Sequence, residues 1–396
     1  MKVYIVGTGM DGRNTLTNEA EKAVAESGLL IGAERMLRPF SSSGKELFAS
    51  YKPADIAEKL SISSHSTAAV LMSGDCGFFS GTKKLIPLLA DFDVSVIPGI
   101  SSVSYFCSKA GLSYERMKFI SLHGQHSNIA VNVRTNEYCF FLLGGDMTAA
   151  DVCRRLCGFG MGGVNVYIGK DLGYPGERII TGKASALTDA EADGLAVMVT
   201  ENNEYLRHIP SAIDDGKFIR GNIPMTKSEV RCIAVAKLDT GSDSVVWDIG
   251  CGTGSVSVEA AFRCPDGKVF SFDKNSEAIM LTNENALEFG CDNIEASEGM
   301  CPDILADIPA PDKVFIGGSS GNLAGIFGIV HSKNPRADIV MTSVSLETLH
   351  DAISCFESYG TSPEIVQLSS ARTKKLGSHT MLQAQNPVFI ISGRTE

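Results

Sequence analysis

The chain has 396 residues, and at roughly 100–200 residues per domain this length predicts two or three domains. Its net charge of −11 argues against nucleic acid as the main partner, because phosphate binding requires a basic surface. No apolar run approaches the roughly 20 residues of a membrane-spanning helix, and no signal peptide is predicted. The 11 cysteines show no disulfide framework or metal-ligand pattern, so we expect reduced thiols, a cytoplasmic location and no metal site.

The first 200 residues alternate short apolar runs with helical stretches, which is typical of an α/β domain. In its first part we predict a helix at residues 17–27, another opened by Ser101 and Ser102, and strands at 2–6, 29–31, 67–72 and 94–97. After about residue 113 a second lobe is predicted, with a helix at 147–157 and strands at 119–122, 138–143, 164–168, 178–182 and 195–199. The pattern therefore predicts a two-lobed first domain over residues 1–203.

The segment 204–221 is predicted to be a linker, because it has little periodicity and contains Pro210 and the turn Asp214-Asp215-Gly216. A new α/β pattern follows over residues 222–396. Its predicted helices lie at residues 255–262 and 276–289, and its strands at 245–249, 268–272, 313–316, 339–343, 364–368 and 388–391. The two halves therefore resemble two separate α/β enzymes on one chain.

The strongest motif of the second half is Asp248 followed by the GxGxG turn Gly250-Cys251-Gly252-Thr253-Gly254. Glycines permit a tight turn and close approach of a ligand, and the next helix offers free N–H groups. We expect Asp248 to hold the amino end of an amino-acid ligand and Asp273, after the next strand, to accept ribose hydroxyls. This half resembles a Rossmann-like class I methyltransferase that uses S-adenosylmethionine (SAM); a nucleotide-binding domain of another kind is the alternative.

Further segments narrow this resemblance. They are Pro-Met-Thr-Lys-Ser-Glu-Val-Arg at 224–231, Glu-Gly-Met-Cys-Pro at 298–302, Phe-Ile-Gly-Gly-Ser at 315–319, Ala-Arg-Thr-Lys-Lys-Leu-Gly at 371–377 and Asn-Pro-Val at 386–388. Together they are similar to the decarboxylating precorrin C-15 methyltransferase family over about residues 222–394. The resemblance implies that Thr226 and the glycine turn contact SAM, that Asp273 binds its ribose and that Met300-Cys301 lies beside the adenine. The family usually has Gly-Asp where this chain has Gly299-Met300.

The first half contains a literal GxGxxG motif at residues 7–12, which alone indicates dinucleotide binding. A dinucleotide site also requires an acidic residue at the end of a strand about 20 residues later. Glu34 has about the right spacing but lies beyond the strand at 29–31, so a nicotinamide site stays an open alternative. Other segments point elsewhere. They are Ser-Gly-Asp-Cys-Gly-Phe-Phe-Ser at 73–80, Ile-Pro-Gly-Ile-Ser-Ser at 97–102 and Ser-Leu-His-Gly-Gln at 121–125.

These segments resemble the tetrapyrrole (corrin/porphyrin) methylase family, specifically its precorrin C-5 members, over about residues 1–200. The resemblance implies that SAM lies folded between the two lobes. The residues carried over as its contacts are Gly74, Asp75, Ser101 and Ser102. The family commonly has Pro in place of Cys76 and often Arg in place of Gln125, and the second difference could remove a contact with a substrate carboxylate.

No Ser/His/Asp constellation is visible, so the catalytic residues stay unknown. The candidates are His123, Arg372 and His379, with solvated loop positions as the alternative. Candidates to bind substrate carboxylates are the cations Arg231, Arg372, Lys374 and Lys375, with an ordinary charged surface as the alternative.

The two resemblances together imply a bifunctional enzyme with two SAM sites. It would methylate a precorrin at carbons 5 and 15 and decarboxylate the ring-C acetate, in cobalamin (vitamin B12) biosynthesis. Its partner would be a small-molecule tetrapyrrole, with no nucleic acid or membrane, and the chain is expected to form a homo-oligomer. Two alternatives stay open: a SAM methyltransferase acting on another tetrapyrrole, and a SAM-responsive binding protein.

Overall fold

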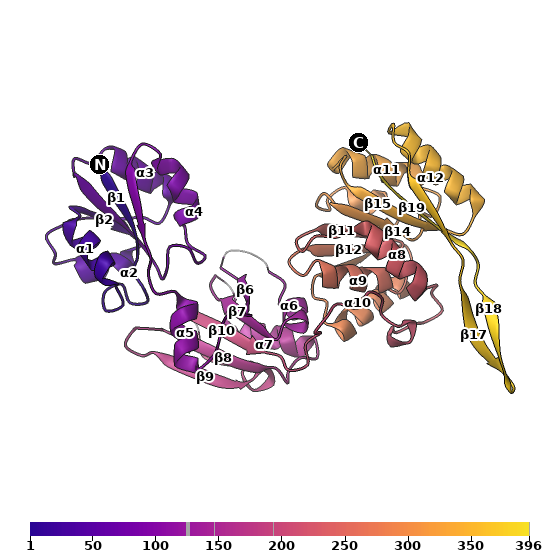
Figure 1. Ribbon diagram of the computed structural model, residues 1–396, viewed down its shortest axis with the longest axis horizontal. Coiled ribbons are helices and arrows are strands. Elements are labelled where there is room, and N and C mark those ends of the chain that lie inside the picture. The colour runs from indigo at the N-terminus through magenta and orange to yellow at the C-terminus, as the bar shows by residue number, and fades with distance from the viewer. Residues whose placement is uncertain (124–126, 146, 193, 396) are drawn as a thin grey trace. The chain divides into compact units, whose positions relative to one another are not determined.

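The computed structural model describes residues 1–123, 127–145, 147–192 and 194–395, and these form two compact units (Figure 1). The first unit comprises Met1–His126, Tyr138–Cys153 and Val164–Glu201. The second comprises Ser127–Glu137, Arg154–Gly163 and Asn202–Glu396. Within these described ranges, no helix is long and apolar enough to cross a membrane.

The first unit begins with a parallel five-stranded sheet in the order β3-β2-β4-β1-β5. Its strands are β1 (Lys2–Gly7), β2 (Leu29–Gly32), β3 (Glu46–Ala49), β4 (Thr67–Met72) and β5 (Asp93–Ile97). The helices and short 3-10 turns are α1 (Asn18–Glu26), α2 (Glu34–Leu37), η1 (Arg38–Phe40), α3 (Pro53–Ser61), α4 (Thr82–Leu85) and η2 (Ile86–Leu89). One face of β1 packs Val3 and Ile5 with α3 and α4, and the other packs Tyr4 and Val6 with α1 and α2. The central strands are therefore continuously apolar because both faces are covered.

A second five-stranded sheet, in the order β6-β7-β10-β8-β9, completes the first unit, and only its β6–β7 pair is parallel. Its strands are β6 (Lys118–Ser121), β7 (Tyr138–Leu142), β8 (Asn165–Lys170), β9 (Arg178–Lys183) and β10 (Ala196–Glu201). The remaining helices of this region of the sequence are α5 (Ser102–Ala110), α6 (Ala130–Thr135), α7 (Ala149–Gly158) and η3 (Ala184–Ala186). The core packs Phe106 of α5 against Phe140, Val197 and Val199 of the sheet.

The second unit contains a seven-stranded sheet in the order β13-β12-β11-β14-β15-β19-β16. Its strands are β11 (Val245–Ile249), β12 (Lys268–Asp273), β13 (Ile294–Glu298), β14 (Lys313–Ile316), β15 (Asp338–Ser343), β16 (Glu364–Leu368) and β19 (Val388–Arg394). The first five are parallel, and β19 runs antiparallel to β15 and β16. This confirms the predicted Rossmann-like α/β fold and places the reversal of strand order at β11, between β12 and β14.

Helices cover both faces of this sheet. They and the short 3-10 turns are η4 (Asp215–Lys217), α8 (Ser228–Leu238), α9 (Ser255–Arg263), α10 (Ser276–Phe289), η5 (Asp303–Leu305), α11 (Leu323–Lys333) and α12 (Leu346–Ser358). One core packs α8 and α9, and the opposite core packs α11 and α12 against Trp247 of β11. Trp247 is fully buried, and its indole N–H donates to the Pro309 carbonyl at 3.1 Å.

The segment predicted to be a linker, 204–221, packs within the second unit. Ile213 and Phe218 are buried in the same core as α8 and α9, so this segment is held by apolar contacts. The domain boundaries themselves stay a prediction.

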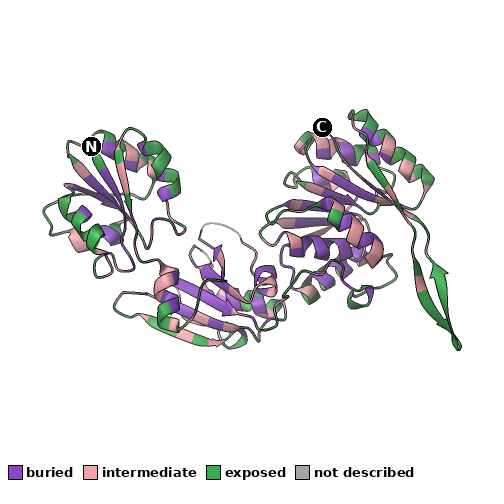
Figure 2. Cartoon of the chain, viewed as in Figure 1, coloured by how far each residue is buried: buried purple, intermediate pink, exposed green. Residues whose placement is uncertain are grey.

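The strands β17 (Ala371–Leu376) and β18 (His379–Ala384) form a two-stranded antiparallel ribbon that the sequence did not predict. Figure 1 shows the ribbon extending from the second unit, and Figure 2 shows that it is largely exposed. Because neither strand has a buried face, its sequence lacks the apolar alternation by which a half-buried strand is predicted.

Candidate functional site

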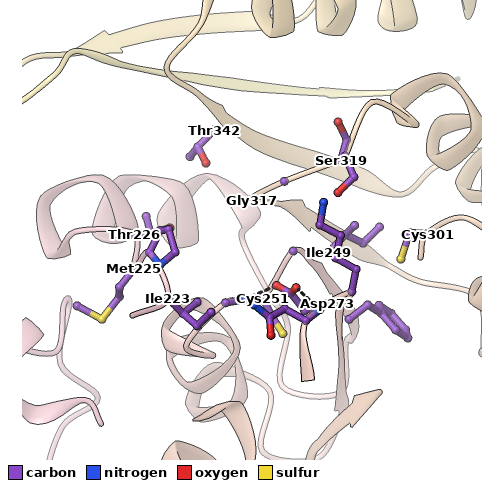
Figure 3. Close-up of a pocket in the computed structure, with 18 of the residues that line it drawn as sticks. Ile223, Met225, Thr226, Ile249, Cys251, Asp273, Cys301, Gly317, Ser319 and Thr342 are labelled. Atoms are coloured by element: carbon purple, nitrogen blue, oxygen red, sulfur yellow. Dashed lines mark hydrogen bonds between the residues drawn. The ribbon is translucent and has the colours of Figure 1, made fainter. Parts of the chain in front are cut away.

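A cavity of about 520 Å³ lies at the carboxyl ends of the parallel strands of the second unit (Figure 3). This is the edge at which ligands bind in open α/β sheets, because the loops diverge where the strand order reverses. The lining comes from five strand ends and from the segment before α8. It comprises residues 223–227, 249–252, 272–275, 299–301, 317–320 and 342–344, with Val230 and Val388.

The glycine turn after β11 has a shape that only glycine adopts without strain. Gly250, Gly252 and Gly254 have φ angles of +74°, +58° and +72°. A Cβ atom on Gly250 would lie 2.6 Å from the backbone nitrogen of Gly318, and one on Gly252 would lie 2.9 Å from the Pro224 carbonyl oxygen. The turn therefore packs directly against two other walls of the cavity before α9 begins at Ser255.

Asp273 is fixed at the end of β12 by two backbone donors. Its Oδ2 accepts from the N–H of Gly252 at 3.1 Å, and its Oδ1 accepts from the N–H of Asn275 at 3.0 Å. The structure brings together in this cavity seven of the residues predicted to bind the cofactor: Thr226, Gly250, Cys251, Gly252, Asp273, Met300 and Cys301. Their contact with a cofactor stays a prediction.

Asp248, Thr253 and Gly254 do not line the cavity. Asp248 is buried behind the turn, where its Oδ2 accepts from the hydroxyl of Ser257, which in turn accepts from Ser271 at 2.9 Å. Its Oδ1 is buried without a hydrogen-bond partner among the described residues, and burial raises the pKa of this carboxyl to about 7. The position of Asp248 therefore suits support of the turn better than the predicted contact with a ligand amino group.

The cations predicted to bind substrate also lie outside the cavity lining. Arg231 is completely buried, and Arg372, near the start of β17, pairs with Glu229 and Asp215. The exposed ribbon carries Lys374, Lys375 and His379. The structure thus brings Arg231 and Arg372 together around Asp215, an arrangement that the sequence did not predict.

Lys227 and Lys274 are the cavity-lining cations that the sequence analysis missed. Each directly follows a residue that was predicted, Thr226 and Asp273 respectively. This adjacency was the only sequence signal for them.

A second cavity, of about 260 Å³, lies in the first unit between loops of its two sheets. It is lined by four of the predicted residues, Gly74, Asp75, Ser102 and His123. Ser101 is absent from this lining; it caps α5, where its hydroxyl accepts from the N–H of Ser104 at 3.2 Å. Gln125 lies outside the described residues.

The carboxylate of Asp75 is held by the backbone. Its Oδ1 accepts from the N–H of Gly77 at 2.8 Å, and its Oδ2 accepts from the N–H of Gly99 at 3.1 Å. Two polar residues that the sequence analysis missed, Arg35 and Tyr174, complete this side of the cavity. The Arg35 guanidinium donates to the Ser73 hydroxyl at 2.9 Å and to the Tyr174 hydroxyl at 3.4 Å.

The GxGxxG motif does not open a helix, because α1 begins only at Asn18, capped by the Thr17 hydroxyl. A Cβ atom on Gly7 would lie 2.5 Å from the Gly99 nitrogen and 2.9 Å from the Gly74 oxygen, so Gly7 lets three loops meet. A nicotinamide site needs a helix that begins at the motif and directs its N–H groups at the pyrophosphate. The arrangement therefore argues against the nicotinamide alternative.

Two family models match the chain: the precorrin methyltransferase domain over residues 218–394, and the tetrapyrrole (corrin/porphyrin) methylases over residues 2–188. A probable cobalt-precorrin-6B C(15)-methyltransferase (decarboxylating) of Pyrobaculum calidifontis is 39% identical over 183 residues, which are 46% of this chain and 94% of that protein. The cobalt-precorrin-6B C(15)-methyltransferase (decarboxylating) of Salmonella typhimurium is 37% identical over 188 residues, 46% of this chain and 95% of that protein. The crystal structure of a precorrin-6y C5,15-methyltransferase from Geobacter metallireducens shares 36% identity with a TM-score of 0.44, covering 47% of this chain and 98% of that chain.

Proposed function

Since this chain belongs to the family of decarboxylating cobalt-precorrin-6B C(15)-methyltransferases through its second half, we propose that it is a bifunctional SAM-dependent enzyme of cobalamin biosynthesis. The second unit would methylate carbon 15 of a precorrin and release carbon dioxide from the ring-C acetate. The first half, which matches the tetrapyrrole methylases, would methylate carbon 5. The observation that carries this proposal is the cavity at the strand-order reversal, where the glycine turn, Thr226 and Asp273 meet.

The protein's main contribution to such a reaction is orientation. An electron-rich macrocycle carbon would attack the methyl group in line as the carbon–sulfur bond breaks. The methylated macrocycle would then lose a proton, or lose carbon dioxide from the ring-C acetate while the electron pair of the broken carbon–carbon bond returns to the ring system. Correct positioning of the two reactants contributes about 7–11 kcal/mol without any covalent nucleophile. In the second unit Asp273 would accept the ribose hydroxyls, the glycine turn would let the ligand approach the backbone, and Met300 and Cys301 would lie beside the adenine.

Two SAM sites are proposed, one in each cavity. Calorimetric titration of the intact chain should find two sites, with Asp273→Ala losing one and Asp75→Ala the other. Asp91→Ala, which removes an exposed carboxylate of the first unit, is the control and should keep both. A single site in the intact chain, or binding of NAD in the first unit, would overturn the two-site proposal.

The product distinguishes this proposal from a methyltransferase acting on another tetrapyrrole. Mass spectrometry should show two added methyl groups together with loss of carbon dioxide. Methylation without decarboxylation would favour the alternative substrate.

Joining the two modules in one chain would keep a labile intermediate near the second site. A mixture of the Asp273→Ala and Asp75→Ala chains retains both activities on different molecules. With each working site at the same low concentration as in the intact chain, this mixture should form the doubly methylated product more slowly than the intact chain. Equal rates would contradict the idea.

We also propose that the chain forms a homo-oligomer through its ribbon and acts in the cytoplasm. Leu376, Met381 and Leu382 on the ribbon are 63%, 54% and 72% exposed, and an isolated two-stranded ribbon is only marginally stable in water. Light scattering should report a mass above that of one chain, and Leu382→Ser should lower it. A monomeric wild-type chain would contradict this assembly.

A further inference from the structure

Arg231, in the first turn of α8, is completely buried and binds the segment that leads to the cofactor cavity. Its Nη1 donates to the Thr226 carbonyl at 2.6 Å and its Nη2 donates to the Ile213 carbonyl. Nη1 also lies 3.2 Å from Oδ1 of Asp215, and the guanidinium stacks 4.8 Å from the ring centroid of Phe218. One side chain therefore holds four points along residues 213–226.

The same guanidinium ties this segment to the helix that follows the glycine turn. Its Nε donates to Oε1 of Glu259 in α9 at 2.6 Å, and that oxygen also accepts from the N–H of Ile213 at 2.9 Å. Glu259 is completely buried, as is Arg231. Buried charges are tolerated only when they are paired and hydrogen-bonded, so removing one partner leaves the other uncompensated.

The far end of the segment forms a wall of the cavity. Residues 223–227 line it, and the carbonyl of Pro224 packs against Gly252 so closely that a Cβ atom there would lie 2.9 Å away. A shift of the segment that moves Pro224 would therefore change the space in front of the glycine turn.

Asp215 extends the arrangement outward to the ribbon. Its Oδ2 lies 2.8 Å from Nη2 of Arg372, near the start of β17. Arg372 also donates through Nε to Glu229 at 2.9 Å and through Nη2 to the Ser228 hydroxyl at 3.0 Å. Charges alternate in sign along a continuous chain from Glu229 through Arg372, Asp215 and Arg231 to Glu259.

We propose that Arg231, Asp215 and Arg372 are positioning residues for the cofactor of the second unit. They hold residues 213–226 against the glycine turn, and through Arg372 they make cofactor affinity depend on the base of the ribbon. None of the three lines the cavity, so each acts through the backbone of Pro224 and Thr226. The inference rests on the proposed function only for the identity of the ligand, SAM.

The test compares Arg372→Gln with Lys237→Gln in the intact chain by SAM calorimetry. Lys237 is also on α8 and forms an ion pair with Glu364 at 2.6 Å, but nothing links that pair to residues 213–226 among the described contacts. Arg372→Gln should weaken SAM binding at the second site about three- to tenfold, the range expected of a partly exposed charge network. Lys237→Gln should bind SAM as the wild type does.

Kinetics separate positioning from general loss of structure. Arg372→Gln should raise KM for SAM and leave kcat at saturating SAM within about twofold, as expected when only ground-state binding is lost. Wild-type affinity in Arg372→Gln, or an equal loss in Lys237→Gln, would overturn the inference. Failure of the wild-type second site to bind SAM would instead refute the proposed function.

Arg231→Lys and Asp215→Asn test the interior of the chain of charges. Lysine keeps the positive charge but cannot reproduce the fork that reaches four acceptors, so Arg231→Lys should lose about tenfold or more in SAM affinity. If Arg231→Lys does not fold, Asp215→Asn preserves the side-chain shape, and it should lose affinity while keeping its melting temperature within a few degrees. Unchanged SAM affinity in a folded Asp215→Asn chain would overturn the inference.

Discussion

The two candidate cofactor sites are built in different ways. The site of the second unit lies on the ends of neighbouring parallel strands of one sheet, while that of the first unit is lined by loops, strands and helices that belong to two sheets and their connections. The first kind is encoded by local motifs, because a strand, its glycine turn and the acid after the next strand are close in sequence. The second kind combines residues as distant as Met10 and Val197, and only the tertiary fold brings them together.

The largest expected difference concerns the buried acid beneath the second site. Burial raises the pKa of Asp248 to about 7 from an unfolded value of 3.8. The protonated carboxyl therefore stabilises the fold fully below about pH 4, and this contribution is lost as the pH rises through about 7. Because one unit of pKa corresponds to about 1.4 kcal/mol, the loss amounts to about 4 kcal/mol.

Asp248→Asn should remove most of this pH dependence, measured as the free energy of unfolding of the second unit between pH 4 and 8. Asp75→Asn is the matched change in the first unit, where backbone N–H groups hold the carboxylate. An equally steep decline in stability for wild type and Asp248→Asn would contradict the assignment.

Glycine substitutions should affect the two sites unequally. Gly250→Ala puts a methyl group against the Gly318 backbone and should weaken SAM binding at the second site about 100-fold, or about 2.7 kcal/mol. The corresponding atom on Gly74 would have no neighbour closer than 3.9 Å, so only the strain of its positive φ remains, and Gly74→Ala should cost about tenfold at the first site. Calorimetry measures the SAM affinity of both variants. Equal losses of affinity in Gly250→Ala and Gly74→Ala would contradict the expected difference between the two sites.

A smaller effect is expected from the Arg35 guanidinium, which lines the cavity of the first unit. The chain is acidic overall, so the proposed polycarboxylate substrate would need a local cation, and we expect Arg35 to supply it in this cavity. Arg35→Gln should raise KM for the tetrapyrrole about tenfold while SAM affinity stays unchanged. Lys84→Gln, on the exposed side of α4, is the control. A loss of SAM affinity instead would place Arg35 at the cofactor.

The smallest effect is expected from thiol modification. Cys301 lines the cavity of the second unit, and burial raises its pKa to about 12. At pH 8 only about one thiol in 10,000 is the reactive thiolate, so brief treatment with iodoacetamide should leave SAM affinity within about twofold. Mass spectrometry of the treated protein checks the site directly. Rapid alkylation of Cys301 that SAM prevents would show a more open cavity wall.

The contrast between local motifs and residues that only the fold brings together also explains which elements the sequence could predict. The strands at 67–72 and 245–249 and the helix at 276–289 agree with β4, β11 and α10, because each is bounded by clear turn or capping residues and has a strongly apolar face. The ribbon was missed because its strands bury nothing. Its cations therefore looked like a surface turn.

Among the site residues, too, those in local motifs were predicted and those that meet across long stretches of sequence were not. The glycine turn and Asp273 were predicted from a motif and Thr226 from the family resemblance, and the structure places Thr226, Asp273 and the first three residues of the turn in one cavity. Arg231 was predicted to bind substrate, but the sequence could not reveal that it would be buried in an ion pair with Glu259, 28 residues away. Arg35 and Tyr174 had no signal at all, since they are 139 residues apart and meet only through the fold.

Trp247 gives the chain an internal optical probe. It is the single tryptophan, it is buried one residue before Asp248, and its ring lies edge-on to Phe272 at 6.3 Å. Intrinsic tryptophan emission therefore reports on the second unit alone, whereas circular dichroism sums over both. Denaturant titrations recorded with the two signals in one sample would show whether the units unfold together, without labels or truncation.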